Sequence, residues 1–290
     1  MIKKKIIIGT AQFGQNYGIS NKSGKTGYKE VKEILSYAKQ KKVLYLDTSS
    51  EYGDAESVLG KADLKNCKVI TKFTPKDFYK NKVDIKKNII NKLIESRKKL
   101  RVKKIYAVLL HNSEFILKNK GNEIYNSLKF AKKVGLISKF GYSIYSFSNL
   151  IKLCAKYRPD MIQCPYNIFD RRLVNQGGIK YMKRHKIEIH VRSIFLQGLL
   201  LMPLKDIPSY FLEWKNLFKK WNNWLLENKS GPLQSCLNFV LNTKGIDKVV
   251  IGVNDLNQLK QILKTNVKKK IVVPKSIQST NKNLICPNLW

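Results

Sequence analysis

The sequence has 290 residues, of which 43% are hydrophobic and 10% aromatic, enough for a large core. α/β barrels of this length commonly form one domain, so we expect residues 1–290 to fold as a single unit. No segment approaches the roughly eighteen consecutive apolar residues of a membrane-spanning helix, which excludes a membrane span. The N-terminal stretch MIKKKIIIGT lacks the long apolar region of a secretory signal, and we expect a cytoplasmic protein.

The net charge is strongly positive, +36, from 56 Lys and Arg against 20 Asp and Glu. Such a charge raises the alternative of a polyanion-binding protein. The lysines are spread along the whole chain, however, and Lys, Asn and Ile are abundant together, a joint bias that the base composition of the coding DNA can produce. We therefore expect weak, salt-sensitive attraction to polyanions and no specific nucleic-acid partner.

The five cysteines are widely spaced and include no Cys-x-x-Cys pair. This arrangement predicts neither a zinc site nor a disulfide framework, and we expect no bound metal. Single thiols of this kind are typical of small buried side chains.

Short apolar runs alternate with amphipathic segments along the chain. The expected strands are residues 6–9, 44–47, 68–72, 105–110, 137–143, 161–164, 188–192 and 248–252. Most are rich in Ile, Val and Leu without alternation, which is typical of strands covered on both faces. Helical periodicity is found in residues 28–41, 83–100, 146–156 and 256–264, with Ser146 and Asp255 in N-cap positions. Eight strand–helix units predict a (β/α)8 TIM barrel.

A doubly wound sheet is the alternative α/β fold. It would normally have about five or six strands and a glycine-rich phosphate loop after the first. Here the first glycines after residues 6–8 are Gly9 and Gly14, so the G-x-G-x-x-G spacing is absent. The pattern therefore favours the barrel.

The connection between residues 192 and 248 is far longer than one helix needs. In it, one helical face is expected from apolar side chains at spacings of three and four, namely Phe211, Trp214, Phe218, Trp221 and Leu225. We expect this stripe to pack on the barrel or to help line a substrate pocket. A basic amphipathic helix that lies on a membrane surface is the alternative.

Polar residues gather at the predicted C-terminal ends of neighbouring strands, where barrels of this kind keep their active sites. They are Asp47 and Lys72 at the ends of the second and third strands, His111 after the fourth, and Tyr52 in the loop after Asp47. Lys72 is expected to lower the pKa of Tyr52, ordinarily about 10, and Asp47 to hold Lys72 charged. His111 could then orient a substrate oxygen, which would complete a proton-delivery site.

Such a site protonates a carbonyl oxygen while another species attacks the carbon. None of its members is a conventional activated nucleophile, and one histidine with one aspartate offers too few ligands for zinc. The attacking species is therefore expected to be a hydride from a bound cofactor. Further polar residues at the later strand ends are Ser143, Gln163, Arg192 and Ser193.

With these residues in place, the chain resembles the aldo-keto reductase family over almost its whole length. The matching segments are GTAQFG, LDTSSEYGDAESVLG, VITKF, LLHNSEF, KFGYS, IQCPYNIFDRR, HVRSIFLQGLL and VVIGVNDLNQL, in the family's order. The resemblance implies a (β/α)8 barrel that uses a nicotinamide cofactor, usually NADPH, to reduce aldehydes and ketones or to run the reverse oxidation.

The resemblance also implies roles for individual residues. Tyr52 matches the general acid, Lys72 and Asp47 its activators, and His111 the residue that orients the substrate. Cofactor contacts are implied for Ser143 and Gln163 at the nicotinamide amide, for Arg192 with Ser193 at its ring, and for Gly252, Val253, Asn254 and Gln258 at the adenosine phosphate. Substrate contacts are expected from Phe13, Tyr17 and Tyr166 at the barrel mouth, and from the segment after Arg192.

The sequence departs from the family pattern in three places. Ser143 is followed by Ile144, where the family usually has asparagine. The family favours NADP(H), but residues 252–258 contain no Lys or Arg for its 2′-phosphate, which keeps NAD(H) as the alternative. Residues 1–5 are too few for the N-terminal hairpin that often closes the barrel bottom, so this hairpin is expected to be short or absent.

The sequence therefore predicts an NAD(P)H-dependent aldo-keto reductase. It would transfer a hydride between the cofactor and a carbonyl or alcohol substrate, an aldehyde or ketone that could be sugar-derived. One alternative is a barrel of this family that senses the cofactor or binds a partner without turnover. The polyanion-binding protein is the other.

Overall fold

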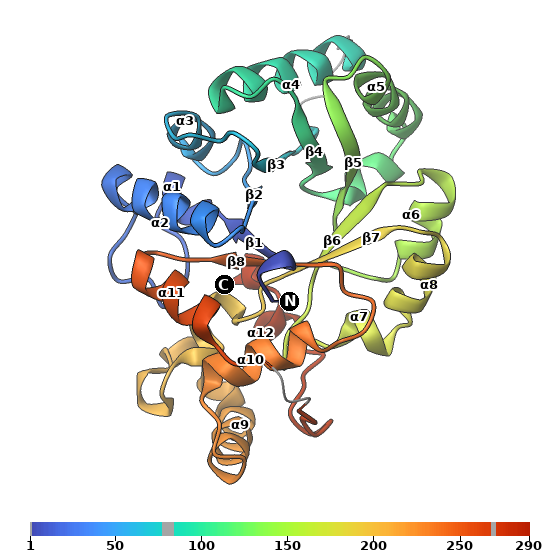
Figure 1. Cartoon of the computed structure of the whole chain (residues 1–290). Coiled ribbons are helices and arrows are strands. Elements are labelled where there is room, and N and C mark those ends of the chain that lie inside the picture. Colours follow the sequence, from blue (N-terminus) through green and yellow to red (C-terminus); the bar gives the residue numbers. More distant parts are fainter. Residues whose placement is uncertain (1, 77–83, 268–270) are drawn as a thin grey trace.

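The computed structural model describes residues 2–76, 84–267 and 271–290. Eight parallel strands close into a barrel in sequence order (Figure 1), which confirms the predicted (β/α)8 fold. The strands are β1 (Ile6–Gly9), β2 (Tyr45–Asp47), β3 (Lys68–Phe73), β4 (Ile105–Leu110), β5 (Ile137–Ser143), β6 (Met161–Pro165), β7 (Glu188–Arg192) and β8 (Lys248–Gly252). The predicted strand bounds are met to within one residue.

Helices surround the barrel and connect its strands (Figure 1). They are α1 (Ala11–Gly14), α2 (Tyr28–Gln40), α3 (Ala55–Gly60), α4 (Ile85–Leu100), α5 (Gly121–Lys133), α6 (Leu150–Lys156), α7 (Arg172–Asn175), α8 (Gly178–Arg184), α9 (Lys215–Glu227), α10 (Pro232–Leu241), α11 (Leu256–Lys264) and α12 (Lys282–Ile285). The predicted start, at residue 83, of the helix that corresponds to α4 lies outside the described residues. A 3-10 turn, Ile2–Lys4, is the element before β1, and among the described residues no strand precedes β1.

The two predicted N-caps have different outcomes. Asp255 caps α11 as expected, because its side chain accepts a hydrogen bond from the Gln258 N–H at 2.8 Å. The prediction for Ser146 is wrong, since α6 begins only at Leu150. The Ser146 hydroxyl instead bonds to the Ser148 hydroxyl at 2.8 Å, within the loop.

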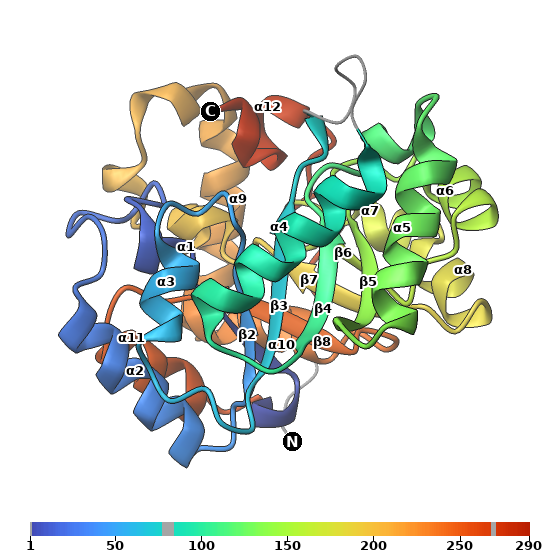
Figure 2. The same cartoon turned by 90° about the horizontal axis from the view of Figure 1, so that it is seen from above.

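The apolar stripe of the long connection after β7 packs against the rest of the protein, as predicted, but it is not the face of one continuous helix. Phe211 and Trp214 lie in a 3-10 helix, while Phe218, Trp221 and Trp224 are buried on α9. In Figure 2 the C-terminal segment with α12 lies beside this connection, and the ring centroids of Phe211 and Trp290 are 4.8 Å apart. No helix in the described part of the chain is long and apolar enough to cross a membrane.

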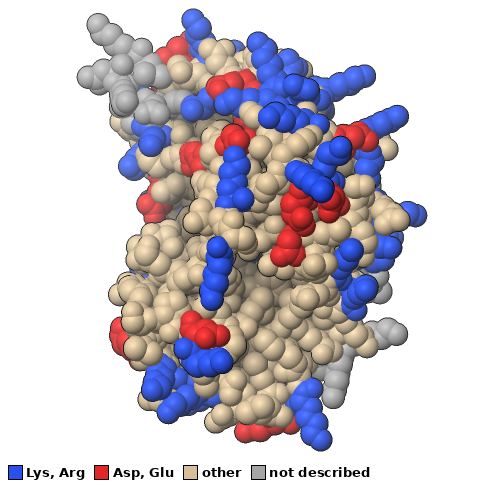
Figure 3. Space-filling model, turned by 90° about the vertical axis from the view of Figure 1, so that its left-hand side faces the viewer, with Lys and Arg blue, Asp and Glu red and all other residues tan. Residues whose placement is uncertain are grey.

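Lysine and arginine side chains are scattered over the surface. On the face drawn in Figure 3 they are interspersed with acidic side chains. Several lysines are held in exposed ion pairs, such as that of Lys25 with Asp54 and that of Lys132 with Asp160. Exposed pairs of this kind contribute about 0–1 kcal/mol each, because solvent screens them.

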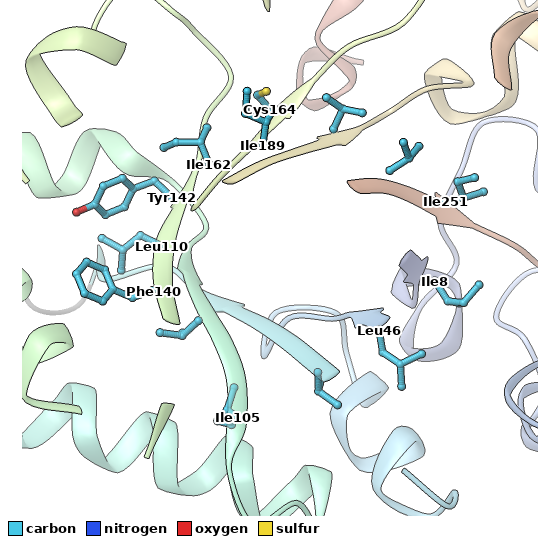
Figure 4. Packing of buried hydrophobic residues seen from close by; sticks show 14 of the residues in the cluster. Ile8, Leu46, Ile105, Leu110, Phe140, Tyr142, Ile162, Cys164, Ile189 and Ile251 are labelled. Atoms are coloured by element: carbon cyan, nitrogen blue, oxygen red, sulfur yellow. The ribbon is translucent and has the colours of Figure 1, made fainter. Parts of the chain in front are cut away.

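Two apolar layers hold the strands in place. Inside the barrel, a small layer is formed by Ile7, Ile70, Ala107, Leu109 and Met161, all fully buried. Outside it, side chains such as Ile8, Leu46 and Ile251 form a larger core between strands and helices (Figure 4). Each fully buried Ile or Leu side chain contributes roughly 1.5–3 kcal/mol to the stability of the fold. This packing fixes the positions of the strand ends that carry the polar residues.

Candidate active site

A buried ion pair lies at the adjacent ends of β2 and β3. Asp47 is in register with Ile70, so Lys72, two residues further along β3, points to the same side of the sheet. Its ammonium contacts Asp47 Oδ1 and donates to the Thr48 carbonyl at 2.9 Å. Gln163 on β6 donates to Asp47 Oδ2 at 2.7 Å. Both charges therefore have the partners that buried charges require.

Tyr52 lies beside this ion pair. Its ring centroid is 5.1 Å from Lys72 Nζ and 5.6 Å from the ring centroid of His111, which meets it edge-on. The tyrosine backbone is fixed by contact with α1, where a Cβ at Gly14 would come within 1.8 Å of the Tyr52 carbonyl oxygen. Glycine is thus required at position 14 for the loop to bring Tyr52 to this place.

The phenol of Tyr52 is held in its protonated form. Burial, and after it the Asp47 carboxylate, raise the pKa of Tyr52 well above its ordinary value, while Arg192 acts in the opposite direction. The expectation of a lowered pKa is therefore wrong, because burial and the Asp47 carboxylate outweigh the effect of the neighbouring cations. A protonated phenol is the state that a proton donor needs.

His111 has a carboxylate partner that the sequence analysis did not identify. Its Nδ1 lies 2.7 Å from Glu51 Oε2, and the other oxygen of Glu51 accepts a hydrogen bond from the Thr74 N–H at 2.6 Å. Burial alone would raise the pKa of Glu51, but the bonds from His111 and Thr74 outweigh it and lower this pKa to about 2. Glu51 is therefore ionised at neutral pH, and it leaves Nε2 as the ring nitrogen available to a ligand.

A cavity of about 460 Å³ opens at the C-terminal ends of the strands. Nine of the residues predicted for the site line it, namely Asp47, Tyr52, Tyr17, Gln163, Arg192, Ser193, Gly252, Asn254 and Gln258. Lys72 and His111 lie behind Tyr52, which they contact through its ring. The structure therefore brings together the predicted proton-delivery residues and most of the predicted cofactor residues.

Besides Lys72 and His111, four predicted residues lie outside this lining. Ser143 and Val253 are buried at the ends of β5 and β8. Phe13 is fully buried in the main core, and Tyr166 stacks on Phe239 with ring centroids 5.2 Å apart. We therefore correct the expectation that Phe13 and Tyr166 form substrate walls, because their rings fill the protein interior.

Arg192 supplies a cation at the catalytic end of the cavity. Its guanidinium lies 4.2 Å from the ring centroid of Tyr145 and donates to the Ile144 carbonyl at 3.4 Å and to the Ser193 hydroxyl at 3.3 Å. These contacts fix the guanidinium plane. A flat, fixed cation on the wall suits a planar ring or an anionic group.

The rest of the wall has features that fit a dinucleotide. The side-chain oxygens Gln12 Oε1 and Asn254 Oδ1 are buried on the wall without a hydrogen-bond partner. Buried acceptors of this kind call for donors from a ligand, such as hydroxyl or amide groups. At Gly252 a Cβ would come within 2.7 Å of the Gln12 side-chain amide, so the absence of a side chain at this position leaves room for Gln12 on the wall.

Several polar residues at the site were not predicted from the sequence. Glu51 directly precedes Tyr52 and could have been noticed by its proximity, but its contact with His111 joins loops 60 residues apart. Gln12, Gln197 and Gln261 carry no signal beyond being polar. Within the described residues, no group of three or more His, Cys, Asp and Glu side chains could hold a metal ion.

Residues 5–279 match the family model described as the aldo/keto reductase family. No relative among the curated proteins matches the chain.

Solved structures share the barrel. An aldo-keto reductase from Bacillus halodurans, in its holo form, has a TM-score of 0.73 and 20% identity over 94% of this chain and 89% of that chain. A Pseudomonas aeruginosa protein, provisionally assigned as an aldo-keto reductase, has a TM-score of 0.65 and 20% identity over 91% and 89% of the two chains. At this identity the likeness supports the fold alone.

Proposed function

Because the chain belongs to the aldo/keto reductase family, we propose that it catalyses nicotinamide-dependent reduction of a carbonyl compound and the reverse oxidation, with Tyr52 as the proton donor and acceptor. The observation that carries the proposal is the place of Tyr52. Its ring lines the cavity, beside the Lys72 ammonium and the edge of His111. An aldehyde or ketone in this cavity would therefore meet a protonated phenol.

Each neighbour of Tyr52 has a distinct task in the proposal. Asp47 and Lys72 form a pair whose charges offset each other, which keeps the phenol protonated until a substrate oxygen accepts the proton. As Tyr52 gives up its proton, the Lys72 ammonium and the His111 ring beside it stabilise the negative charge that develops on its oxygen. Glu51 accepts a hydrogen bond from His111 Nδ1, which fixes the orientation of the ring and leaves Nε2 for the substrate.

The cofactor is assigned to the cavity wall. When bound, the nicotinamide supplies the hydride. We assign Gln163, Arg192 and Ser193 to its nicotinamide end, and the unpartnered oxygens of Gln12 and Asn254 to donors elsewhere on the dinucleotide. The substrate then has the remaining space beside Tyr17, Tyr52 and the segment after β7.

Cofactor titration followed by a carbonyl panel tests the proposed function. We expect purified protein to bind a reduced nicotinamide dinucleotide with a micromolar Kd, roughly the range of enzyme substrates. Addition of aldehydes and ketones should then consume the reduced-cofactor absorbance in proportion to enzyme. The proposal would be contradicted if the protein bound neither NADH nor NADPH.

Replacing Glu51 with glutamine should weaken the alignment of His111. The amide oxygen can still accept a hydrogen bond from Nδ1, but the bond is no longer strengthened by a negative charge. We expect kcat/KM for carbonyl reduction to fall about tenfold, chiefly through KM, and E51D to recover part of it. Steady-state kinetics with the cofactor saturating would measure this. An unchanged kcat/KM for E51Q would show that the contact has no part in turnover.

The raised pKa of Tyr52 predicts opposite pH dependences for the two directions. Reduction needs the phenol protonated, so its rate should not fall on the alkaline side below about pH 10. Oxidation needs the phenolate, so its kcat/KM should rise about tenfold per pH unit between about pH 7 and pH 9. Initial rates in both directions across this range check the prediction. A fall in reduction centred near neutral pH would contradict it.

A further inference from the structure

The cavity extends from the catalytic residues to helix α11. Tyr52 and Asp47 line one end, and Gln258, Gln261 and Ile262 line the other. A dinucleotide with its nicotinamide at Tyr52 therefore directs its adenosine half toward α11. NADH and NADPH differ only there, by the 2′-phosphate on the adenosine ribose, so the groups at the start of α11 decide which of the two is accepted.

Two of the first backbone donors of α11, the N–H groups of Leu256 and Gln258, already have carboxylate acceptors. Helix N-termini commonly bind phosphate through free N–H groups. Here the Leu256 N–H donates to Glu30 Oε1 at 2.5 Å, and the Gln258 N–H donates to Asp255 Oδ1 at 2.8 Å. The Asn254 N–H donates to the Gln258 side-chain oxygen at 2.9 Å. A phosphate would have to displace these acceptors.

The charges at this end also oppose a phosphate. Two carboxylates, Glu30 and Asp255, lie at the helix start, and among the described lining residues the lone cation, Arg192, stands at the catalytic end. Two lysines of the neighbouring segments are engaged elsewhere. Lys25 pairs with Asp54 at 2.6 Å, and Lys260 Nζ lies 5.8 Å from the ring centroid of Tyr37 on α2.

The remaining polar groups suit a ribose with free hydroxyls. The side-chain amides of Gln258 and Gln261 line the cavity beside the apolar Ile262. In dinucleotide sites of other folds, a carboxylate near the ribose selects the free 2′-hydroxyl, whereas an arginine accommodates the 2′-phosphate. The same electrostatic rule applies here, because it depends on the charge of the group and not on the fold.

We propose that Glu30 and Asp255 select NAD(H) over NADP(H). The two carboxylates occupy the helix N-terminus that a 2′-phosphate would need and repel its charge. The amides of Gln258 and Gln261 then receive the ribose hydroxyls. This inference rests on the proposed function, because it takes the nicotinamide to lie at Tyr52.

Binding of the two cofactors to the purified full-length chain tests the inference without turnover. NADH and NADPH are titrated by calorimetry or tryptophan fluorescence at about 0.15 M salt, where screening limits the attraction of the positively charged surface for the extra phosphate. We expect NADH to bind at least about tenfold more tightly. Tighter binding of NADPH overturns the inference and leaves the proposed function intact. Binding of neither overturns the proposed function itself.

Charge-neutralising variants identify the residues responsible. In E30Q/D255N, NADPH affinity should rise about tenfold and NADH affinity should change by less than about twofold, because only the phosphate loses a like-charge contact. Asparagine keeps the N-cap of α11, so the helix start is retained. Glu213→Gln together with Glu227→Gln, both exposed, also removes two negative charges and makes a matched control for net charge. Unchanged NADPH affinity in E30Q/D255N, or an equal gain in E213Q/E227Q, overturns the assignment.

Discussion

Phenylalanine in place of Tyr52 should lower kcat/KM for carbonyl reduction by about 10²–10⁴-fold, the contribution of a positioned general acid. The substitution removes one oxygen atom and keeps the ring between Lys72 and His111. Cofactor affinity should therefore change by less than about threefold, and the melting temperature by less than about 3 °C. Initial rates with the carbonyl panel, cofactor titration and thermal melting measure the three quantities.

A second tyrosine on the same wall provides the matched control. Tyr17 lines the cavity, and burial raises the pKa of its phenol to about 12. Because the ring of Tyr17 is not held against the Lys72 ammonium and the His111 ring as that of Tyr52 is, Tyr17→Phe should cost less than about tenfold in kcat/KM. Equal losses in the two variants, or near-normal turnover by Y52F, would contradict the role of Tyr52. The second result would favour a barrel that binds cofactor without catalysis.

Asp47→Asn should destabilise the fold by about 3–5 kcal/mol, because it leaves the buried Lys72 ammonium without a counter-charge. Both side chains are at most 4% exposed, so solvent cannot replace the lost carboxylate. The free energy of unfolding from denaturant titration measures the effect. In the matched variant Asp54→Asn, the broken pair with Lys25 is about half exposed, and we expect a loss of about 0–1 kcal/mol.

A double mutant separates the charge effect from general damage to the site. In D47N/K72M no ammonium remains to be left unpaired, so we expect at least about 1 kcal/mol of the D47N loss to be recovered. Strict additivity of the two single losses would show that the pair is not the source of the destabilisation. Turnover should stay low in the double mutant, because both neighbours of Tyr52 have changed.

The barrel could be predicted from sequence because its pattern is local. Each strand is a short apolar run bounded by polar residues. Parallel strands buried on both faces can be recognised from such runs without knowing which strands pair. The ends of those runs then place Asp47 and Lys72 at the same edge of the sheet. The start of α6 was misplaced because Ser146 bonds within its loop, a choice that composition does not determine.

The wrong predictions about the site concern three-dimensional proximity. Phe13 and Tyr166 lie near strand ends in sequence, but which side of the wall they face depends on packing against residues such as Phe239. The direction of the pKa shift of Tyr52 depends on how deeply the folded chain buries the phenol and on how close Asp47 lies to it. The contact of Glu30 with α11 spans 226 positions and has no local signature.

The closure of the barrel has a consequence for how the chain folds. β1 pairs with β8 through Ile6↔Val249 to Gly9↔Gly252, which joins segments from opposite ends of the sequence. Until residues 248–252 have been synthesised, β1 and β7 each present an unpaired edge to other chains. Such long-range pairing slows folding and prolongs exposure of these edges. Truncation before β8 should therefore yield an aggregating sheet instead of a smaller folded domain.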